Sequence, residues 1–170
     1  DAQESRGLGD VYKRQALYSE RTDEKIKFRN HIVKPESMIL TPQHAPEWTK
    51  NRQRLWNEVD KVEKNNAKTK NPRLAKEVLL SLPNDFDREV QTELTKDFIK
   101  SEFVDQGMVA DISIHRDDMN NPHAHVLLTQ RPFNSDGTWG KKTKTRTQYD
   151  ENGHAILNKN GNKVRKQERF

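Results

Sequence analysis

Three histidines stand close together in the sequence, at positions that could bring their imidazoles around one metal ion. His115, His123 and His125 fall within eleven residues. His123 and His125 are two residues apart in an apolar run, so in a β-strand both rings point to the same face. His115 ends the preceding alternating run, with the parity that places it beside them. Three imidazoles from adjacent strands leave positions open for substrate or water, and imidazole is the commonest protein ligand of such metals.

The sequence around these histidines predicts the strands that would hold them. Residues 108–115 alternate between two faces, residues 122–130 follow after a short polar loop, and this order favours an antiparallel hairpin. If the two strands pair, the three rings converge on a metal site. The alternative is that a His-x-His pair on a strand is an ordinary surface feature, and the third histidine at matching parity favours the metal site. The remaining histidines, His31, His44 and His154, have no such neighbours.

Four further segments carry a periodic pattern of apolar residues. They are a strand over 32–40, a helix over 46–64, a strand over 74–82 and a helix over 87–106. Asp87 is a suitable N-cap and Gly107 a suitable terminator for the second helix, in which Val90, Leu94 and Phe98 are spaced by four. The order of elements predicts an α+β fold, with a mostly antiparallel sheet and helices packed on one face.

Composition limits the classes of protein to which the chain can belong. Hydrophobic residues make up 31% and charged residues 34% of the 170 residues, so the core must be modest. The net charge of +5 favours a polyanionic partner such as nucleic acid. No apolar run is long enough to span a membrane, and no signal peptide opens the chain. The absence of cysteine excludes disulfides and thiolate catalysis, and it fits the cytoplasmic location that we expect.

Changes in composition divide the chain into three parts. Residues 1–15 are polar and aperiodic, and we interpret them as a disordered or foreign segment. Residues 16–131 hold the periodic segments and form the expected core domain. Residues 132–170 are basic and rich in turn signals, which predicts a loop or hairpin extension, with a hairpin over 149–164.

The stretch around the histidines resembles a known family. GMVADISIHRDDMNNPHAHVLLTQR, residues 107–131, resembles the signature of the MobA/MobL plasmid mobilisation relaxases, within the wider class of His-hydrophobe-His nickases. That signature has a strand ending in His, a short acidic loop, and then Asn-Pro-His-Ala-His before an apolar run. Upstream segments at 45–63, 73–87 and 94–115 are similar to the family's segments in the family's order. The resemblance covers about residues 17–142.

The resemblance implies an activity, a cofactor and partners. Such relaxases nick single-stranded DNA at a transfer origin when a tyrosine attacks a phosphodiester and keeps the 5′ end as a phosphotyrosine. A divalent metal ion, Mg²⁺ or Mn²⁺, held by the three histidines would bind the scissile phosphate. The implied partners are transfer-origin DNA and accessory mobilisation proteins. Neither Tyr12 nor Tyr18 has the sequence expected around the nucleophile, so we expect the nucleophile to be missing from this chain and the chain to be an inactive fragment.

Other residues complete the expected site. The family often has an acidic residue at Glu77, where a carboxylate could orient a metal-bound histidine, and we assign Glu77 to the catalytic site. An exposed strand carboxylate is the alternative. Basic residues after the second histidine strand could neutralise DNA phosphates, although a charge run is often only a solvated face. These residues are Arg131, Lys141, Lys142, Lys144 and Arg146.

Two other functions remain open on the sequence. A rolling-circle replication initiator or a transposase of the same superfamily would share the histidine site. A non-catalytic metal- and DNA-binding module would share both the histidines and the basic residues. The helix over 46–64 favours the relaxase branch.

Overall fold

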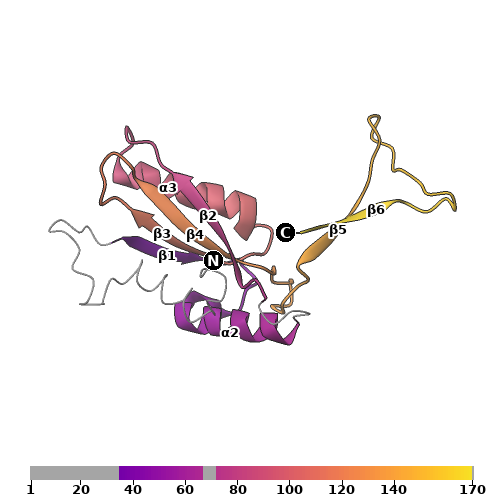
Figure 1. Cartoon of the computed structure of the whole chain (residues 1–170), viewed down its shortest axis with the longest axis horizontal. Helices are drawn as coiled ribbons and strands as arrows, with labels where there is room; N and C mark the ends of the chain where they lie inside the picture. Colours follow the sequence, from indigo (N-terminus) through magenta and orange to yellow (C-terminus); the bar gives the residue numbers. More distant parts are fainter. Residues whose placement is uncertain (1–34, 67–71, 170) are drawn as a thin grey trace, which may run out of the picture.

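The computed structural model describes residues 35–66 and 72–169, and its centre is one four-stranded sheet (Figure 1). The strands are β1 (Glu36–Leu40), β2 (Ala75–Ser81), β3 (Ala110–His115) and β4 (His123–Thr129). Their order in the sheet is β1-β3-β4-β2, and every neighbouring pair is antiparallel. With two α-helices packed against this sheet, the predicted α+β class is confirmed.

The predicted hairpin of β3 and β4 forms the middle of the sheet. Its register pairs Ala110 with Leu128 and His115 with His123. The edge strands come from distant parts of the sequence, β1 beside β3 and β2 beside β4. All six residues of β3 are buried, because both faces of this central strand are covered.

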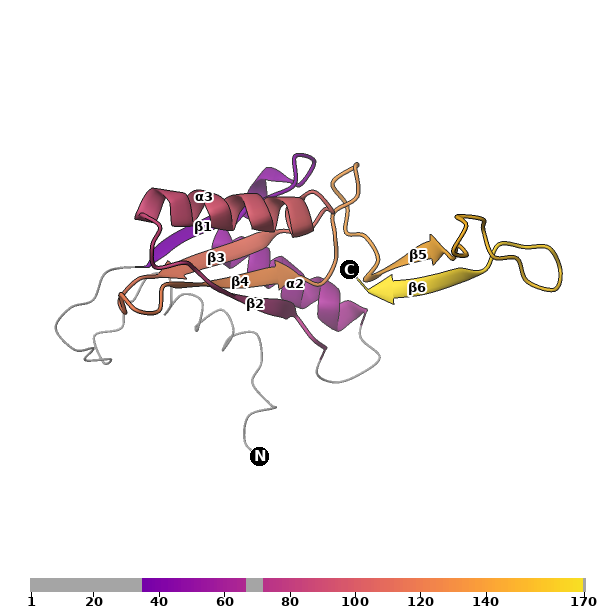
Figure 2. The same ribbon diagram turned by 90° about the horizontal axis from the view of Figure 1, so that it is seen from above.

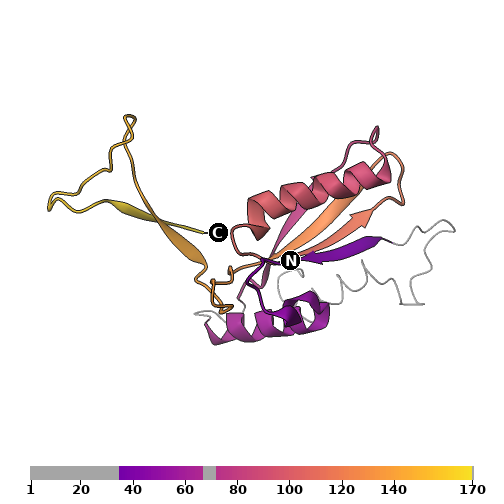
Figure 3. The ribbon, with the colours of Figure 1, turned by 180° about the vertical axis from the view of Figure 1, so that it is seen from behind.

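The two helices pack on opposite faces of the sheet (Figures 1 and 3), so the prediction of helices on one face is wrong. The helix α3 (Arg88–Ile99) lies over the face that contains Ile112 and Val126. The helix α2 (Arg52–Asn65) lies over the face that contains Val109 and Leu127. The physical reason is that β3 and β4 carry apolar side chains on both faces, and each face must be covered to keep those side chains from water.

The helix α3 begins where the sequence predicts and, together with the turn that follows it, ends at the predicted Gly107. Its regularly spaced apolar residues, however, lie on the side that is partly exposed and not on the side that packs on the sheet. The Asp87 carboxylate accepts a hydrogen bond from the Val90 amide at 2.8 Å, which caps the helix. A π-helical turn, η2 (Lys100–Val104), extends the helix to Gly107, whose φ of +97° ends it. A Cβ at Gly107 would lie 2.9 Å from the Phe133 carbonyl oxygen. The spaced residues Val90, Leu94 and Phe98 are each 44% exposed.

The predicted helix over 46–64 is divided in two. A short 3-10 helix, η1 (Glu47–Lys50), precedes α2, and Asn51 between them has extended backbone angles. The Asn51 side chain accepts a hydrogen bond from the Arg54 amide at 2.9 Å, so it caps α2 and forces the break. The strand expected over 32–40 is present as β1, and residues 32–34 lie outside the described residues.

The chain after β4 first packs on the core and then leaves it. Phe133 is buried in the same cluster as α2, and the Trp139 ring stacks on it with ring centres 4.2 Å apart. The antiparallel strands β5 (Thr143–Thr147) and β6 (Arg165–Arg169) then form a hairpin that extends away from the sheet (Figure 2). Within the segment between these strands, two isolated bridges, Tyr149–Ala155 and Leu157–Lys163, each close a separate short turn. No helix within residues 35–66 and 72–169 is long and apolar enough to cross a membrane.

Candidate functional site

The structure brings the three predicted histidines together at one end of the sheet, on the α2 face. The ring centres of His115 and His123 lie 5.2 Å apart. His125 lies 5.1 Å from each of them. His115 ends β3 and is paired with His123 at the start of β4, and this register is what makes the rings converge. Rings bound to one ion through bonds of about 2.1 Å would have centres roughly 5 Å apart, which is close to the spacing seen.

Hydrogen bonds determine which nitrogen two of these rings can offer to a metal. His123 Nδ1 donates to the Asn121 carbonyl oxygen at 2.8 Å. His125 Nδ1 donates to the Glu77 carboxylate at 3.1 Å. Because each acceptor oxygen requires a proton on Nδ1, the neutral ring keeps its lone pair on Nε2. A carbonyl or carboxylate oxygen that accepts from Nδ1 is the usual outer partner of a metal-binding histidine.

The donor set fits a divalent metal, although the rings are not closed around an ion. In the part of the chain that the structure describes, no three His, Cys, Asp or Glu side chains already surround a single point as in a metal-loaded centre. The ring spacing and the two Nδ1 hydrogen bonds are compatible with metal binding after a change of side-chain torsions, which can adjust while the strand register cannot. Three imidazoles suit a transition metal better than Mg²⁺.

A buried charge cluster fixes β3 beneath α2, on the same face as the histidines. Asp111 is fully buried, and its carboxylate accepts from Arg52 Nε at 2.9 and 3.0 Å and from Trp56 Nε1 at 2.9 Å. Both partners lie on α2, so these bonds hold the helix over the far end of β3. A buried carboxylate is stable only when it is paired and hydrogen-bonded in this way.

A second cluster of hydrogen bonds surrounds Arg116, the residue after His115, and its partners lie on β1 and on α3, which covers the opposite face of the sheet. Arg116 donates to Glu36 at 2.9 Å, to Gln91 at 2.8 Å and to Thr92 at 2.8 Å. These partners belong to β1 and α3, so the end of β3 is tied to both elements next to His115. These contacts of Arg116 could not be predicted from the sequence, because its partners lie 24 to 80 positions away.

Two of the five predicted DNA-binding residues are bonded to a buried carboxylate. Glu63 of α2 is 1% exposed, and it accepts from Arg131 Nε at 2.9 Å and forms an ion pair with Lys142. Arg131 also donates to the Gly140 carbonyl oxygen at 3.3 Å. The positive charges of Arg131 and Lys142 therefore balance a negative charge inside the protein, which leaves less of them for DNA.

The other three predicted residues are more open to a ligand. Lys141 is exposed, Lys144 donates to the Gln106 side chain at 3.0 Å, and Arg146 lies 3.5 Å from Glu168 in an exposed pair. The fold adds Lys76 and Arg169 to this group, and sequence analysis missed both. Burial lowers the pKa of Lys76, and the nearby charges of Arg169 and Lys144 lower it further. A bound polyanion would reduce the repulsion among these neighbouring positive charges.

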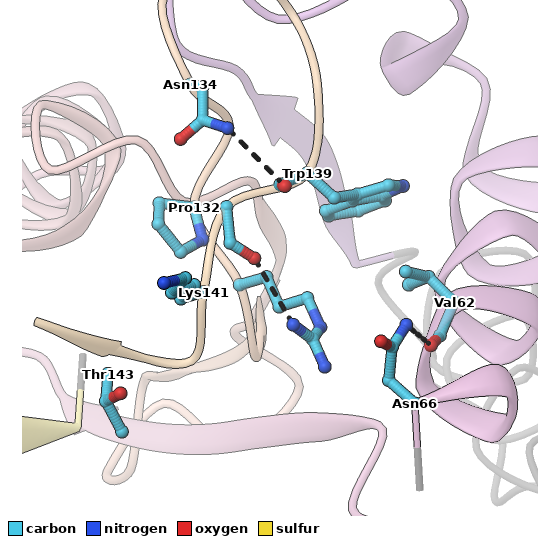
Figure 4. Close-up of a pocket in the computed structure, with 9 residues that line it drawn as sticks. Val62, Asn66, Pro132, Asn134, Trp139, Lys141 and Thr143 are labelled. Carbon is cyan, nitrogen blue, oxygen red and sulfur yellow. Dashed lines mark hydrogen bonds between the residues drawn. The ribbon is translucent and has the colours of Figure 1, made fainter.

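A pocket of ≈ 530 Å³ lies where residues 131–146, which we call the basic segment, meet α2 (Figure 4). Arg131, Lys141 and Trp139 line it, and the Asn134 amide reaches toward the backbone oxygen of Trp139 across its rim. The indole of Trp139 also packs against Trp48, with ring centres 6.2 Å apart. This ring is thus part of the core as well as of the pocket wall.

The histidines and the basic residues lie at opposite ends of β4. His123 begins that strand and Thr129 ends it, two residues before Arg131. At about 3.3 Å per residue, the strand separates the two ends by roughly 20 Å. The basic segment is therefore near the histidines in sequence but not in space.

Comparisons with known proteins identify the family to which the chain is similar. The profile of the MobA/MobL family matches residues 11–169. The "Conjugal transfer protein TraA" of Agrobacterium fabrum is 30% identical over 133 residues, covering 72% of this chain and 11% of that protein. The "Probable mobilization protein MobA" of Bifidobacterium longum is 31% identical over 121 residues, covering 69% of this chain and 20% of that protein.

A solved structure also has the same fold. It is described as "Molecular Basis of Vancomycin Resistance Transfer in Staphylococcus aureus", and it is 31% identical, with a TM-score of 0.61. The match covers 79% of this chain and 69% of that one. The chain spans only a small part of the curated relatives it matches, but almost all of it matches the family profile. The chain belongs to the MobA/MobL family.

Proposed function

We propose that the chain is the core of a DNA relaxase, which nicks single-stranded DNA at a plasmid transfer origin by transesterification to a tyrosine. The observation that carries the proposal is the convergence of His115, His123 and His125 on one sheet face. Family membership supports it, and so do relatives named for conjugal transfer and mobilisation.

The three histidines would hold a divalent ion through their Nε2 atoms. When bound, such an ion supplies positive charge that binds the scissile phosphate and offsets the charge developing on its oxygens. Of Mg²⁺ and Mn²⁺, the nitrogen donors favour Mn²⁺. Asn121 and Glu77 orient two of the rings by accepting from Nδ1, which keeps Nε2 directed to the ligand side.

The reaction exchanges one phosphoester bond for another. The tyrosine hydroxyl loses its proton as its oxygen attacks phosphorus, the bond from phosphorus to the 3′ oxygen breaks, and the leaving oxygen takes up a proton. The 5′ end stays on the tyrosine, so the bond energy is conserved for rejoining. Tyr12 and Tyr18 lie outside the described residues, and we propose that neither is the nucleophile.

Metal binding is the direct test of the histidine site. Titration of the chain with Mn²⁺ and Mg²⁺, followed by calorimetry, should show one site per chain with Mn²⁺ bound more tightly. His123→Ala should weaken Mn²⁺ binding at least about tenfold, because one of three ligands is lost. His154→Ala is the matched control, since this exposed histidine lies in a turn beside Asp150. Equal affinities for the two variants would contradict the proposed site.

Cleavage is tested separately with labelled single-stranded transfer-origin DNA. We expect metal and DNA binding but no covalent adduct with the chain alone. Joining the strand and tyrosine-bearing helix of a close relative ahead of residue 35 should produce a phosphotyrosine adduct, and His123→Ala should abolish it. An adduct with the chain alone that is lost in Tyr12→Phe or Tyr18→Phe would show that the chain supplies its own nucleophile.

A further inference from the structure

The outer surface of α3 carries a partly exposed apolar row, of which Phe98 makes a ring contact with Phe103 of η2. Val90, Leu94 and Phe98 are spaced by four, so they lie along one side of the helix, and each is 44% exposed. Figures 1 and 3 show α3 on the opposite face of the sheet from α2. Alternation along β3 and β4 places the histidines on the α2 face. An exposed row of this kind on a helix is typical of a binding surface.

The side of α3 that packs on the sheet is mostly polar, which makes the outward row more informative. Its buried residues are Gln91, Thr92, Thr95 and Ile99. The polar ones are satisfied locally: Thr95 donates to the Gln91 carbonyl oxygen at 2.8 Å, and Gln91 donates to that of Pro83 at 2.9 Å. The helix thus buries polar side chains, which need hydrogen-bond partners, and leaves apolar side chains partly exposed to water, which is unfavourable.

An acidic row runs beside the apolar one. Glu89, Glu93 and Asp97 have the same spacing of four, are all exposed, and precede the apolar residues by one position each. Glu93 is paired with Lys96 at 2.7 Å in an exposed ion pair. Residues 85–106 contain seven acidic and three basic residues, a net charge of −4, in a chain with a formal charge of +5. The acidic surface therefore departs from the charge of the chain as a whole.

We propose that this double row, defined as Val90, Leu94 and Phe98 with Glu89, Glu93 and Asp97, is a docking surface for a basic amphipathic helix of a protein partner. An apolar row on that helix would cover the apolar row of α3, and lysines or arginines beside it would pair with the acidic row. Nucleic acid and anionic membrane surfaces are disfavoured, because both are repelled by the acidic row. A second copy of the chain is disfavoured for the same reason, since its own α3 would bring like charges together.

A designed peptide tests the surface without the natural partner. The probe is a labelled 18-residue helical peptide with a leucine row and an adjacent lysine row, titrated with the full chain by fluorescence anisotropy. The double variant Leu94→Ser and Phe98→Ser should weaken binding at least about tenfold, or ~1.4 kcal/mol. Glu89→Gln with Asp97→Asn should weaken binding and reduce its salt dependence. Leu157→Ser is the control, because it removes an exposed apolar residue from the distant hairpin.

Other results would overturn the proposal. Equal peptide affinity for wild type, both row variants and the control would show that the peptide binds elsewhere. Light scattering that shows a wild-type dimer, lost in the Leu94→Ser and Phe98→Ser variant, would identify a second copy as the occupant. Circular dichroism and Mn²⁺ binding should be unchanged in all variants, since the side chains substituted on α3 are partly or fully exposed on the face opposite the histidines and Leu157 lies on the distant hairpin.

Discussion

At the scale of single residues, hydrogen bonds fix the orientation of two of the three histidine rings, those of His123 and His125. Glu77 is exposed on the edge strand β2, yet its carboxylate reaches the Nδ1 atom of His125. Such a partner holds the ring orientation and raises the basicity of the nitrogen that binds metal. We therefore propose that Glu77 acts through His125, as a positioning residue.

Substitution of Glu77 should weaken metal binding in a graded way. Glu77→Ala removes the acceptor and is expected to lower Mn²⁺ affinity about tenfold. Glu77→Gln should cost less, because its carbonyl oxygen can still accept from Nδ1. Calorimetric titration measures both, with Glu58→Ala on α2 as the control carboxylate. If the alanine variant binds Mn²⁺ as tightly as wild type, Glu77 has no positioning role.

The parity of the histidines could be predicted from sequence because strand side chains alternate with a period of two. His115, His123 and His125 needed only that rule and the hairpin to be placed together. The clamp on Arg116 could not be predicted. It joins β1 and α3 to the end of β3, and no local pattern records a contact between such distant segments.

At the scale of elements, the prediction that both helices pack on one face of the sheet is wrong for the same reason: local sequence patterns do not record contacts between distant segments. The spacing of Val90, Leu94 and Phe98 predicted that α3 is a helix, and it is one. Spacing does not show which side of a helix faces the sheet, and here the apolar row faces outward. The choice of opposite faces for α2 and α3 follows from apolar residues on both faces of β3 and β4, which becomes clear only once the strands are paired.

In the segment that follows β4, Arg131 and Lys142 pair with the buried Glu63, whereas we propose that Lys144 and Arg146 serve DNA binding. Lys142→Ala should lower the free energy of unfolding by about 1 kcal/mol, because it removes a partner of the buried Glu63 but is itself part-exposed. Lys144→Ala and Arg146→Ala should leave stability nearly unchanged. Each should reduce the slope of log affinity against log salt for single-stranded DNA by about 0.7.

Urea denaturation and salt-dependent anisotropy measure the two effects on the same variants. Lys50→Ala is the control, because this exposed lysine pairs with Glu47 on η1, away from the basic segment. A Lys142→Ala protein of full stability with a flattened salt slope would assign Lys142 to DNA instead of to Glu63.

At the scale of the whole molecule, the sheet separates the candidate metal site from the basic segment by the length of β4. Sequence analysis placed them together because Arg131 follows His125 by only six positions. An extended strand turns a short interval of sequence into a long distance, roughly 20 Å here. A DNA strand that contacts both ends must therefore run along the molecule.

The separation predicts a dependence on oligonucleotide length. Lys144→Ala should weaken binding of a twelve-nucleotide single strand but leave binding of a trinucleotide unchanged, because a trinucleotide held at the histidines does not reach the hairpin. His123→Ala should reduce Mn²⁺-dependent binding of both. Fluorescence anisotropy with the two lengths provides the measurement. An equal loss for both lengths in the Lys144→Ala variant would mean that DNA binds mainly at the basic end.

The hairpin of β3 and β4 also has a consequence for how the chain folds. All three imidazoles belong to a segment of eleven residues, whereas β1 reaches its place through the pairing of Glu36 with Ile114, and β2 through that of Ala75 with Thr129. Closing a short loop costs less entropy than closing a long one, so local hairpin contacts form more readily than these distant ones. The ligand set is thus assembled by the contacts of lowest contact order in the sheet. Substitutions that weaken an edge strand should therefore lower the free energy of unfolding before they separate the three histidines.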